Sequence, residues 1–163
     1  MSKELDGLKE QIKLLQKKIE LLEQKENKQI WKPQIGHEYY SINHCLEIIK
    51  NKFEGDTIDK KLFDVINIYP TKEQAERKAF EQLIHRKLEK FAYENNENEI
   101  DWNNTDKNKY YVYYDYYDNC LDVEDVYDYN RDFGQVYFTS REIAKKAMKT
   151  FENDLIRFFT TNK

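Results

Sequence analysis

IYPTKEQA, residues 68–75, and YFTSREIA, residues 137–144, are two copies of one pattern in a chain of 163 residues. Each copy starts with apolar residues typical of a strand and continues with a hydroxyl residue, Thr71 or Ser140, that can cap a helix. In the first copy, Gln74 completes a capping box with Thr71. The pattern therefore predicts two strand-to-helix junctions, and it makes the chain a tandem repeat.

The residues before each junction match as well. A tyrosine pair at residues 39–40 returns at residues 110–111, and a Cys-Leu-acid-aliphatic run at residues 45–48 returns at residues 120–123. Strand-forming residues bounded by turn residues predict a short meander in both copies. The expected strands are residues 39–42, 45–49 and 63–69 in the first copy and residues 109–115, 121–126 and 135–138 in the second.

Each copy is expected to end in one amphipathic helix. Apolar residues recur every three or four positions from Ala75 to Phe91 and again from Ala144 to Phe159, which is the spacing of one buried helix face. The predicted fold class is α+β, with a short antiparallel sheet covered by one helix in each unit. The first unit spans residues 31–96 and the second spans residues 97–163.

Residues 1–28 carry a heptad pattern. Its a positions hold mostly Ile and its d positions hold only Leu, which favours a parallel two-stranded coiled coil. The expected dimerisation residues are Leu5, Leu8, Ile12, Leu15, Ile19 and Leu22. We therefore expect a homodimer held by this helix. Leu14 and Leu21 widen the apolar face, so docking of the helix on its own chain stays open as an alternative.

The composition favours a folded chain without a membrane segment. Thirteen Tyr and nine Phe supply a large apolar area, whereas four Gly and two Pro are too few for a loop-dominated chain. No apolar run approaches the roughly 18 residues of a membrane span, and the charged N-terminus is unlike a signal peptide. We expect a cytoplasmic protein, with Cys45 and Cys120 as buried, reduced thiols at matching places in the repeat.

The net charge of −4 conceals an asymmetry along the chain. Residues 97–139 hold eleven acids against Lys107, Lys109 and Arg131, a balance of −8, so the remaining residues carry +4. A segment of this charge repels a polyanion and attracts a basic protein surface. Charge therefore predicts that the segment binds a basic protein and does not bind nucleic acid directly.

The acidic segment is also rich in tyrosine. Residues 110–130 contain eight Tyr and six acids but no Lys or Arg. Carboxylates spaced along strands could imitate nucleic-acid phosphates, and tyrosines would add rigid contact area. The candidate partner-binding residues are Asp115, Tyr116, Asp118, Asp122, Glu124, Asp125 and Asp128. The alternative interpretation is a solvated strand face opposite a tyrosine-lined core.

Positive charge on the two predicted helices supports a second hypothesis, direct binding of nucleic acid. The residues are Arg77, Lys78, Arg86, Lys87 and Lys90 on the first helix and Lys145, Lys146, Lys149 and Arg157 on the second. Basic residues on exposed helix faces are more often ordinary solvated surface. The basic helices are therefore the alternative to the acidic segment.

Nothing in the sequence indicates an enzyme, a metal site or a cofactor. His44 and Cys45 are adjacent, so on a strand their side chains would point to opposite faces, which opposes a catalytic Cys–His pair or a shared metal. The many carboxylates have no Gly-rich pocket loop and no basic residue nearby. We expect a non-enzymatic binding protein without a cofactor.

Three segments resemble small proteins encoded by phages and prophages of low-GC bacteria. They are WKP at 31–33 with Gly36 and the tyrosine pair at 39–40, Leu88 with FAYENN at 91–96, and VYF at 136–138 with SREIA at 140–144. The resemblance covers roughly residues 31–155 and lies at strand-to-helix junctions, so it carries no catalytic residues. It implies an accessory protein that acts in the cytoplasm of the bacterial host. Such proteins often block a defence nuclease, so the resemblance implies an anti-CRISPR-like inhibitor.

Overall fold

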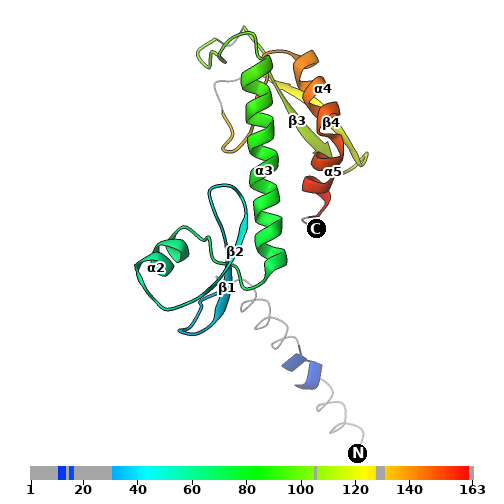
Figure 1. Ribbon diagram of the computed structural model, residues 1–163. Coiled ribbons are helices and arrows are strands. Elements are labelled where there is room, and N and C mark those ends of the chain that lie inside the picture. Colours follow the sequence, from blue (N-terminus) through cyan, green and yellow to red (C-terminus); the bar gives the residue numbers. More distant parts are fainter. Residues whose placement is uncertain (1–10, 14, 17–30, 105, 128–130, 162–163) are drawn as a thin grey trace, which may run out of the picture.

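The computed structural model describes residues 11–13, 15–16, 31–104, 106–127 and 131–161. It is an α+β fold of two antiparallel hairpins joined through one long helix (Figure 1). The first unit holds β1 (Glu38–Ile42), β2 (Ile48–Lys52), α2 (Thr57–Asp64) and α3 (Lys72–Asn95). The second unit holds β3 (Lys109–Asp115), β4 (Cys120–Val126), α4 (Arg141–Thr150) and α5 (Glu152–Thr160). The predicted α+β class is confirmed.

Both predicted strand-to-helix junctions are present and use the same bonds. Tyr40 forms an antiparallel bridge with Tyr69, and Tyr110 forms the equivalent bridge with Phe138. The caps also match, because Thr71 Oγ1 accepts the N–H of Gln74 at 3.3 Å and Ser140 Oγ accepts the N–H of Ile143 at 3.2 Å. Each predicted third strand is thus reduced to a single bridge beside the hairpin.

These bridges correct the alignment of the two repeats by one residue. Because Tyr40 and Tyr110 make equivalent bridges, Tyr39 corresponds to Lys109 and not to Tyr110. Tyr39 and Lys109 are both buried, but the Tyr39 hydroxyl bonds Asp59 Oδ1 at 2.7 Å while Lys109 Nζ bonds the Asn104 carbonyl at 2.7 Å. The two units share a backbone plan and differ in the polar contacts beneath it.

The predicted strand over residues 63–69 is wrong for most of its length. Helix α2 begins after Asp56, whose side chain accepts the N–H of Asp59, and it covers residues that were expected to precede or begin the strand. A short apolar run fits a strand or a helix equally well, so periodicity does not distinguish them. The second strand begins at Ile48, three residues after the predicted start at Cys45. Asn43 Oδ1 accepts the N–H groups of Cys45 and Glu47 and holds these residues in the turn.

Helix α3 belongs to both apolar clusters. Near its start Ala75 and Ala79 pack with Ile42 of the first hairpin. Further along, Ile84 and Ala92 join the larger cluster under the second hairpin, and Figure 1 shows α3 running from one hairpin to the other. The helix that was expected to cover only the first sheet therefore forms part of the second core.

The single helix expected after Ser140 is divided at Phe151 into α4 and α5. Phe151 departs from helical backbone angles, and its ring packs edge-on against Phe91 of α3 at 5.8 Å between centroids. Both short helices lie over one face of the second hairpin (Figure 1). The apolar stripe remains continuous through Ala144, Ala147 and Leu155, all buried.

Most of the predicted coiled-coil residues, Leu5, Leu8, Ile19 and Leu22, lie outside the described residues. Ile12 and Leu15, at predicted a and d positions, are helical and are 56% and 59% exposed. In the part of the chain that the structure describes, no helix is long and apolar enough to cross a bilayer.

Candidate functional site: the outer face of the second hairpin

The second hairpin has an inner face toward the helices and an outer face away from them. Val112 pairs with Val123, and both are buried in the core. Alternate residues point the other way, so Tyr111 opposite Glu124 and Tyr113 opposite Asp122 lie outward. We call the outer face the set Tyr111, Tyr113, Asp115, Cys120, Asp122 and Glu124. Three of its six members are predicted site residues.

A row of aromatic rings begins on this face and continues beyond the hairpin. The ring centroids of Tyr113 and Tyr111 are 6.2 Å apart, those of Tyr111 and Tyr137 are 5.8 Å apart, and those of Tyr137 and Trp102 are 4.9 Å apart. The last two contacts are edge-to-face, an arrangement that aromatic pairs prefer, and the first is tilted. The outer face therefore carries two half-buried tyrosine rings beside carboxylates, and the row continues inward through the buried Tyr137.

The tyrosines of the outer face stay neutral beside these carboxylates. The Tyr111 hydroxyl donates to Glu124 Oε2 at 3.0 Å. Burial, together with this bond, raises the pKa of Tyr111 to about 12. Partial burial raises the pKa of Tyr113 as well, and the charges of Asp122 and Glu124 add to the effect. Negative charge on the face consequently comes from the carboxylates, while the tyrosines supply neutral hydroxyl groups.

The hairpin turn presents fewer free groups than the sequence suggests. Asp115 Oδ1 accepts the N–H groups of Tyr117 and Asp118 at 2.7 and 3.2 Å, which shapes the turn. The Tyr116 hydroxyl donates to the Phe159 carbonyl at 2.9 Å and ties the turn to α5. Tyr117, which was not predicted, is 92% exposed. Asp118 and Tyr117 are therefore the residues that project from the turn.

Of the other predicted site residues, Tyr116 and Asp118 lie in the turn. Asp125 lies on the inner side, where its Oδ1 meets Arg141 Nη2 at 2.5 Å and its Oδ2 accepts from Asn108 Nδ2 at 3.0 Å. Its charge is already paired inside the fold, so we leave Asp125 out of the candidate site. Asp128 lies outside the described residues.

The sequence could have separated these residues by parity. Tyr111, Tyr113 and Asp115 share one strand face, as do Asp122 and Glu124, whereas Asp125 has the opposite parity on β4. Reading alternate residues would have placed Tyr111 and Tyr113 in the site. It would not have revealed Trp102 and Tyr137, which reach the row from other segments.

Both cysteines are exposed, contrary to expectation. Cys45 lies in the turn between β1 and β2, and Cys120 begins β4 on the outer face. Partial burial raises the pKa of Cys120, and the charges of Asp118, Asp115 and Asp122 contribute. The repeated cysteine therefore lies in or next to a hairpin turn and not in the core.

The basic helix residues are mostly engaged with the rest of the chain. Lys87 pairs with Asp154 at 2.9 Å, and the Arg157 guanidinium lies 4.2 Å from the Phe80 ring centre. Lys78, Lys90, Arg86 and Lys146 also have partners. Among the predicted basic residues, all of which are described, Arg77, Lys145 and Lys149 lack an ion pair or side-chain hydrogen bond, and Arg157 has only its contact with the Phe80 ring. The helices thus present isolated cations and no continuous basic surface.

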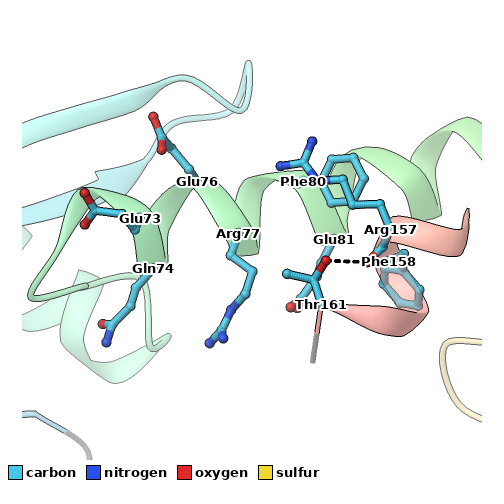
Figure 2. A pocket seen from close by; sticks show the side chains of 9 residues that line it. All are labelled: Glu73, Gln74, Glu76, Arg77, Phe80, Glu81, Arg157, Phe158 and Thr161. Atoms are coloured by element: carbon cyan, nitrogen blue, oxygen red, sulfur yellow. Dashed lines mark hydrogen bonds between the residues drawn. The ribbon is translucent and has the colours of Figure 1, made fainter. Parts of the chain in front are cut away.

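A pocket of about 370 Å³ lies between the start of α3 and the end of α5 (Figure 2). Its lining combines Phe80 and Phe158 with the guanidinium groups of Arg77 and Arg157. Three glutamates also line it, so the lining holds both cations and anions beside two aromatic rings. In the described part of the chain, no three His, Cys, Asp or Glu side chains are grouped as a metal site would need. The mixed lining favours no ligand class, so the outer face remains the stronger candidate.

Comparisons with protein-family models, with curated proteins and with solved structures find no match to this chain. The resemblance to phage proteins stays a prediction. The candidate site therefore rests on its own geometry and charge.

Proposed function

We propose that this protein is a non-enzymatic inhibitor that binds a basic surface of another protein through the outer face of its second hairpin. The observation that carries the proposal is the pair of adjacent tyrosine rings, Tyr111 and Tyr113, beside the carboxylates of the outer face. Tyrosine provides large amphipathic contact area with little entropy loss, and it is enriched among the residues that dominate binding energy. The surface has the composition of a protein-binding site.

The charge of this surface is not neutralised within the described chain. Asp115 and Asp122 accept backbone N–H groups, Glu124 accepts the Tyr111 hydroxyl, and none of these forms an ion pair with a described Lys or Arg. Unpaired carboxylates attract a basic partner and speed its association. By contrast, the paired Asp125 contributes little to this field.

The spacing of the carboxylates supports a partner that normally binds nucleic acid. Asp122 and Glu124 are alternate residues of one strand, so they are separated by about 6.8 Å. That is about twice the 3.4 Å axial spacing of phosphates along one DNA strand. The partner we propose is a host nucleic-acid-handling protein, with a defence nuclease such as a CRISPR effector as the class that the phage resemblance implies.

The test is capture of proteins from a bacterial lysate by the full chain and by a variant of the outer face and turn. The variant carries Asp115→Asn, Asp118→Asn, Asp122→Asn and Glu124→Gln. We expect it to lose partners that the parent retains, with affinity falling roughly tenfold or more and with weaker salt dependence. Added duplex DNA should displace the same partners from the parent, because both compete for one basic surface.

A matched control removes the same number of charges elsewhere. Glu38, Glu76, Glu89 and Glu94 are exposed glutamates whose ion pairs are all on the surface, so their change to Gln should affect stability little. The control should capture the parent's partners. Capture of the same partners by the outer-face variant would contradict the proposal.

Direct binding of nucleic acid is the other outcome to be measured. A gel-shift assay with duplex and single-stranded DNA at about 150 mM salt should show no complex, since a −8 segment and phosphates repel. If a complex forms, is lost in Lys145→Ala with Lys149→Ala, and persists in the outer-face variant, then the basic helices carry the function.

A further inference from the structure

Helix α2 and its C-terminal cap carry an apolar stripe that is exposed in the described part of the chain. Ile58, Val65 and Ile66 are 66%, 71% and 57% exposed, and the half-buried Leu62 lies between them. Positions 58 and 62 are one helical turn apart on α2, and Val65 and Ile66 follow directly in its C-terminal cap. Figure 1 shows α2 standing apart from α3, beside the first hairpin. This stripe is a surface without a described partner element.

Ile66 adds a second and independent observation. It has a φ of 55°, in the left-handed region that β-branched residues rarely adopt. The N–H of Asn67 bonds the Leu62 carbonyl and that of Ile66 bonds the Phe63 carbonyl, the arrangement that usually places Gly at this position. An exposed Ile is thus held in a strained conformation where glycine would relieve the strain. Strain retained at a surface position points to a contact made by that side chain.

The charge around α2 suits self-association. Residues 31–70 contain five Lys and six acids, a balance of −1, against −8 for residues 97–139. A near-neutral apolar surface can meet a copy of itself without repulsion, whereas the second hairpin would repel its own copy. Charge therefore opposes a symmetric contact through the second hairpin and does not oppose one through the surface around α2.

The chain before the first unit points to the same partner. Ile12 and Leu15 are helical and exposed, as seam residues of a coiled coil would be in a single chain. The predicted coiled coil ends at residue 28 and the first unit begins at residue 31. Paired helices lie about 8–10 Å apart, and three residues span at most about 10 Å. Two first units would therefore start close together.

We propose that the α2 stripe, Ile58, Leu62, Val65 and Ile66, is an interface between two copies of this chain. In this arrangement the stripes meet across the two-fold axis of the predicted coiled coil, and each Ile66 contacts the partner copy. The second hairpins are left free on both copies. This interface does not depend on the binding function proposed for the outer face.

Sedimentation equilibrium of the full chain tests the interface. We expect the parent to be a dimer, and Ile58→Ser with Val65→Ser to raise its dissociation constant about tenfold or more, because two apolar side chains per copy lose their burial. The control, Tyr93→Ser with Phe133→Ser, removes two even more exposed rings from α3 and the second unit. It should leave the constant within about twofold of the parent. A monomeric parent, or equal effects of the two pairs, would overturn the proposal.

Two further measurements guard against a variant that only unfolds α2. Ile66→Gly should weaken the dimer. At protein concentrations below the dissociation constant, where the chain is monomeric, it should raise the melting temperature because the strain is relieved. In a Cys45→Ser, Cys120→Ser background, a short bis-maleimide should link copies through Ile58→Cys. It should not link them through Lys60→Cys, which lies about 200° around the same helix. Linking at residue 60 alone, or an unchanged dimer in Ile66→Gly, would contradict the interface.

Discussion

Asp59 is a buried carboxylate that holds the first unit together. It accepts the Tyr39 hydroxyl at 2.7 Å and the N–H groups of Glu54 and Gly55 at 2.6 and 2.8 Å. Burial acts to raise the pKa of Asp59, but the Tyr39 hydroxyl and the backbone N–H groups together lower it below 3.8. The three donors join β1, the loop after β2 and α2 around one charge.

The lowered pKa of Asp59 makes its contribution to the free energy of unfolding depend on pH. Because the folded pKa lies below the unfolded one, Asp59 stabilises the fold at neutral pH and loses that contribution as pH falls through the folded value. Asp59→Asn should lower the free energy of unfolding by about 2 kcal/mol at pH 7. The gap to the parent should narrow below about pH 4. Urea titrations at several pH values measure it, with exposed Asp64→Asn as the control that should change little.

Arg141 protects the free edge of β4. Its Nη1 donates to the Val123 carbonyl at 2.9 Å while its Nη2 meets Asp125, and the Val123 N–H is taken by Asp122 Oδ1 at 2.7 Å. Both backbone groups of Val123 are thus occupied by side chains. An edge strand blocked in this way is a poor template for pairing with another chain.

Arg141→Lys should weaken this protection, because an ammonium group does not reproduce two parallel guanidinium bonds. We expect a loss of about 1 kcal/mol in the free energy of unfolding and faster aggregation on heating. Lys72 occupies the matching repeat position and pairs only with Glu76 on the surface, so Lys72→Arg is the control. Thermal melts with light scattering give the comparison, and equal behaviour of the two variants would refute an edge-blocking role.

At the scale of elements, the second hairpin separates its functions by face. Its inner face packs under α4 and α5, whereas its outer face carries half-buried tyrosines, carboxylates and the exposed Cys120 thiol. The first hairpin has the same plan, but a buried carboxylate and α2 occupy its surroundings instead. One backbone unit thus supports two different surfaces.

Cys120 can report the electrostatics of the outer face. Asp118, Asp115 and Asp122 help to raise its pKa, and only the thiolate reacts. In a Cys45→Ser background, Asp118→Asn with Asp122→Asn should therefore increase the rate of labelling by a thiol reagent near pH 8. Glu38→Gln with Glu76→Gln is the control for net charge and should leave the rate unchanged. Labelling only after denaturation would show that Cys120 is not exposed.

At the scale of the whole molecule, α3 joins the two units. Ile84 is 1% exposed and lies in the core beneath the second hairpin, although its helix begins against the first. The boundary predicted at residue 96 follows the order of elements along the chain. Packing crosses that boundary, so unfolding one unit removes part of the wall of the other.

We therefore expect one cooperative unfolding transition. Trp31 and Trp102 lie in different units, so Trp102→Phe leaves a reporter in the first and Trp31→Phe a reporter in the second. In either background, Ile84→Ala should lower the free energy of unfolding by about 3 kcal/mol and shift both fluorescence transitions together. A shift confined to the Trp102 signal would mean that the units unfold separately.

Local pattern determined the junctions, because caps and periodicity act within a few residues. Thr71, Ser140 and the alanines after them predicted two helices that the structure contains. The acidic, tyrosine-rich stretch was likewise evident from residues 110–130. The sequence did not show which face of these strands is covered by the helices. The alternation of side chains along β4 predicts that Asp122 and Asp125 point to opposite sides. Which side is buried depends on where α4 and α5, later in the chain, pack against the strand.

Tertiary structure alone decided the remaining features. The bridges to Tyr69 and Phe138 determine how the two repeats align. They match Tyr40 with Tyr110, which shifts the predicted alignment of the two tyrosine pairs by one residue. Helix α2 adds to its local cap at Asp56 a bond between Asp59 and Tyr39, which lies twenty residues earlier in the chain. The shared core depends on α3 reaching a sheet that is formed later in the chain. In each case the deciding free energy comes from burial and bonds between distant segments, which no local pattern encodes.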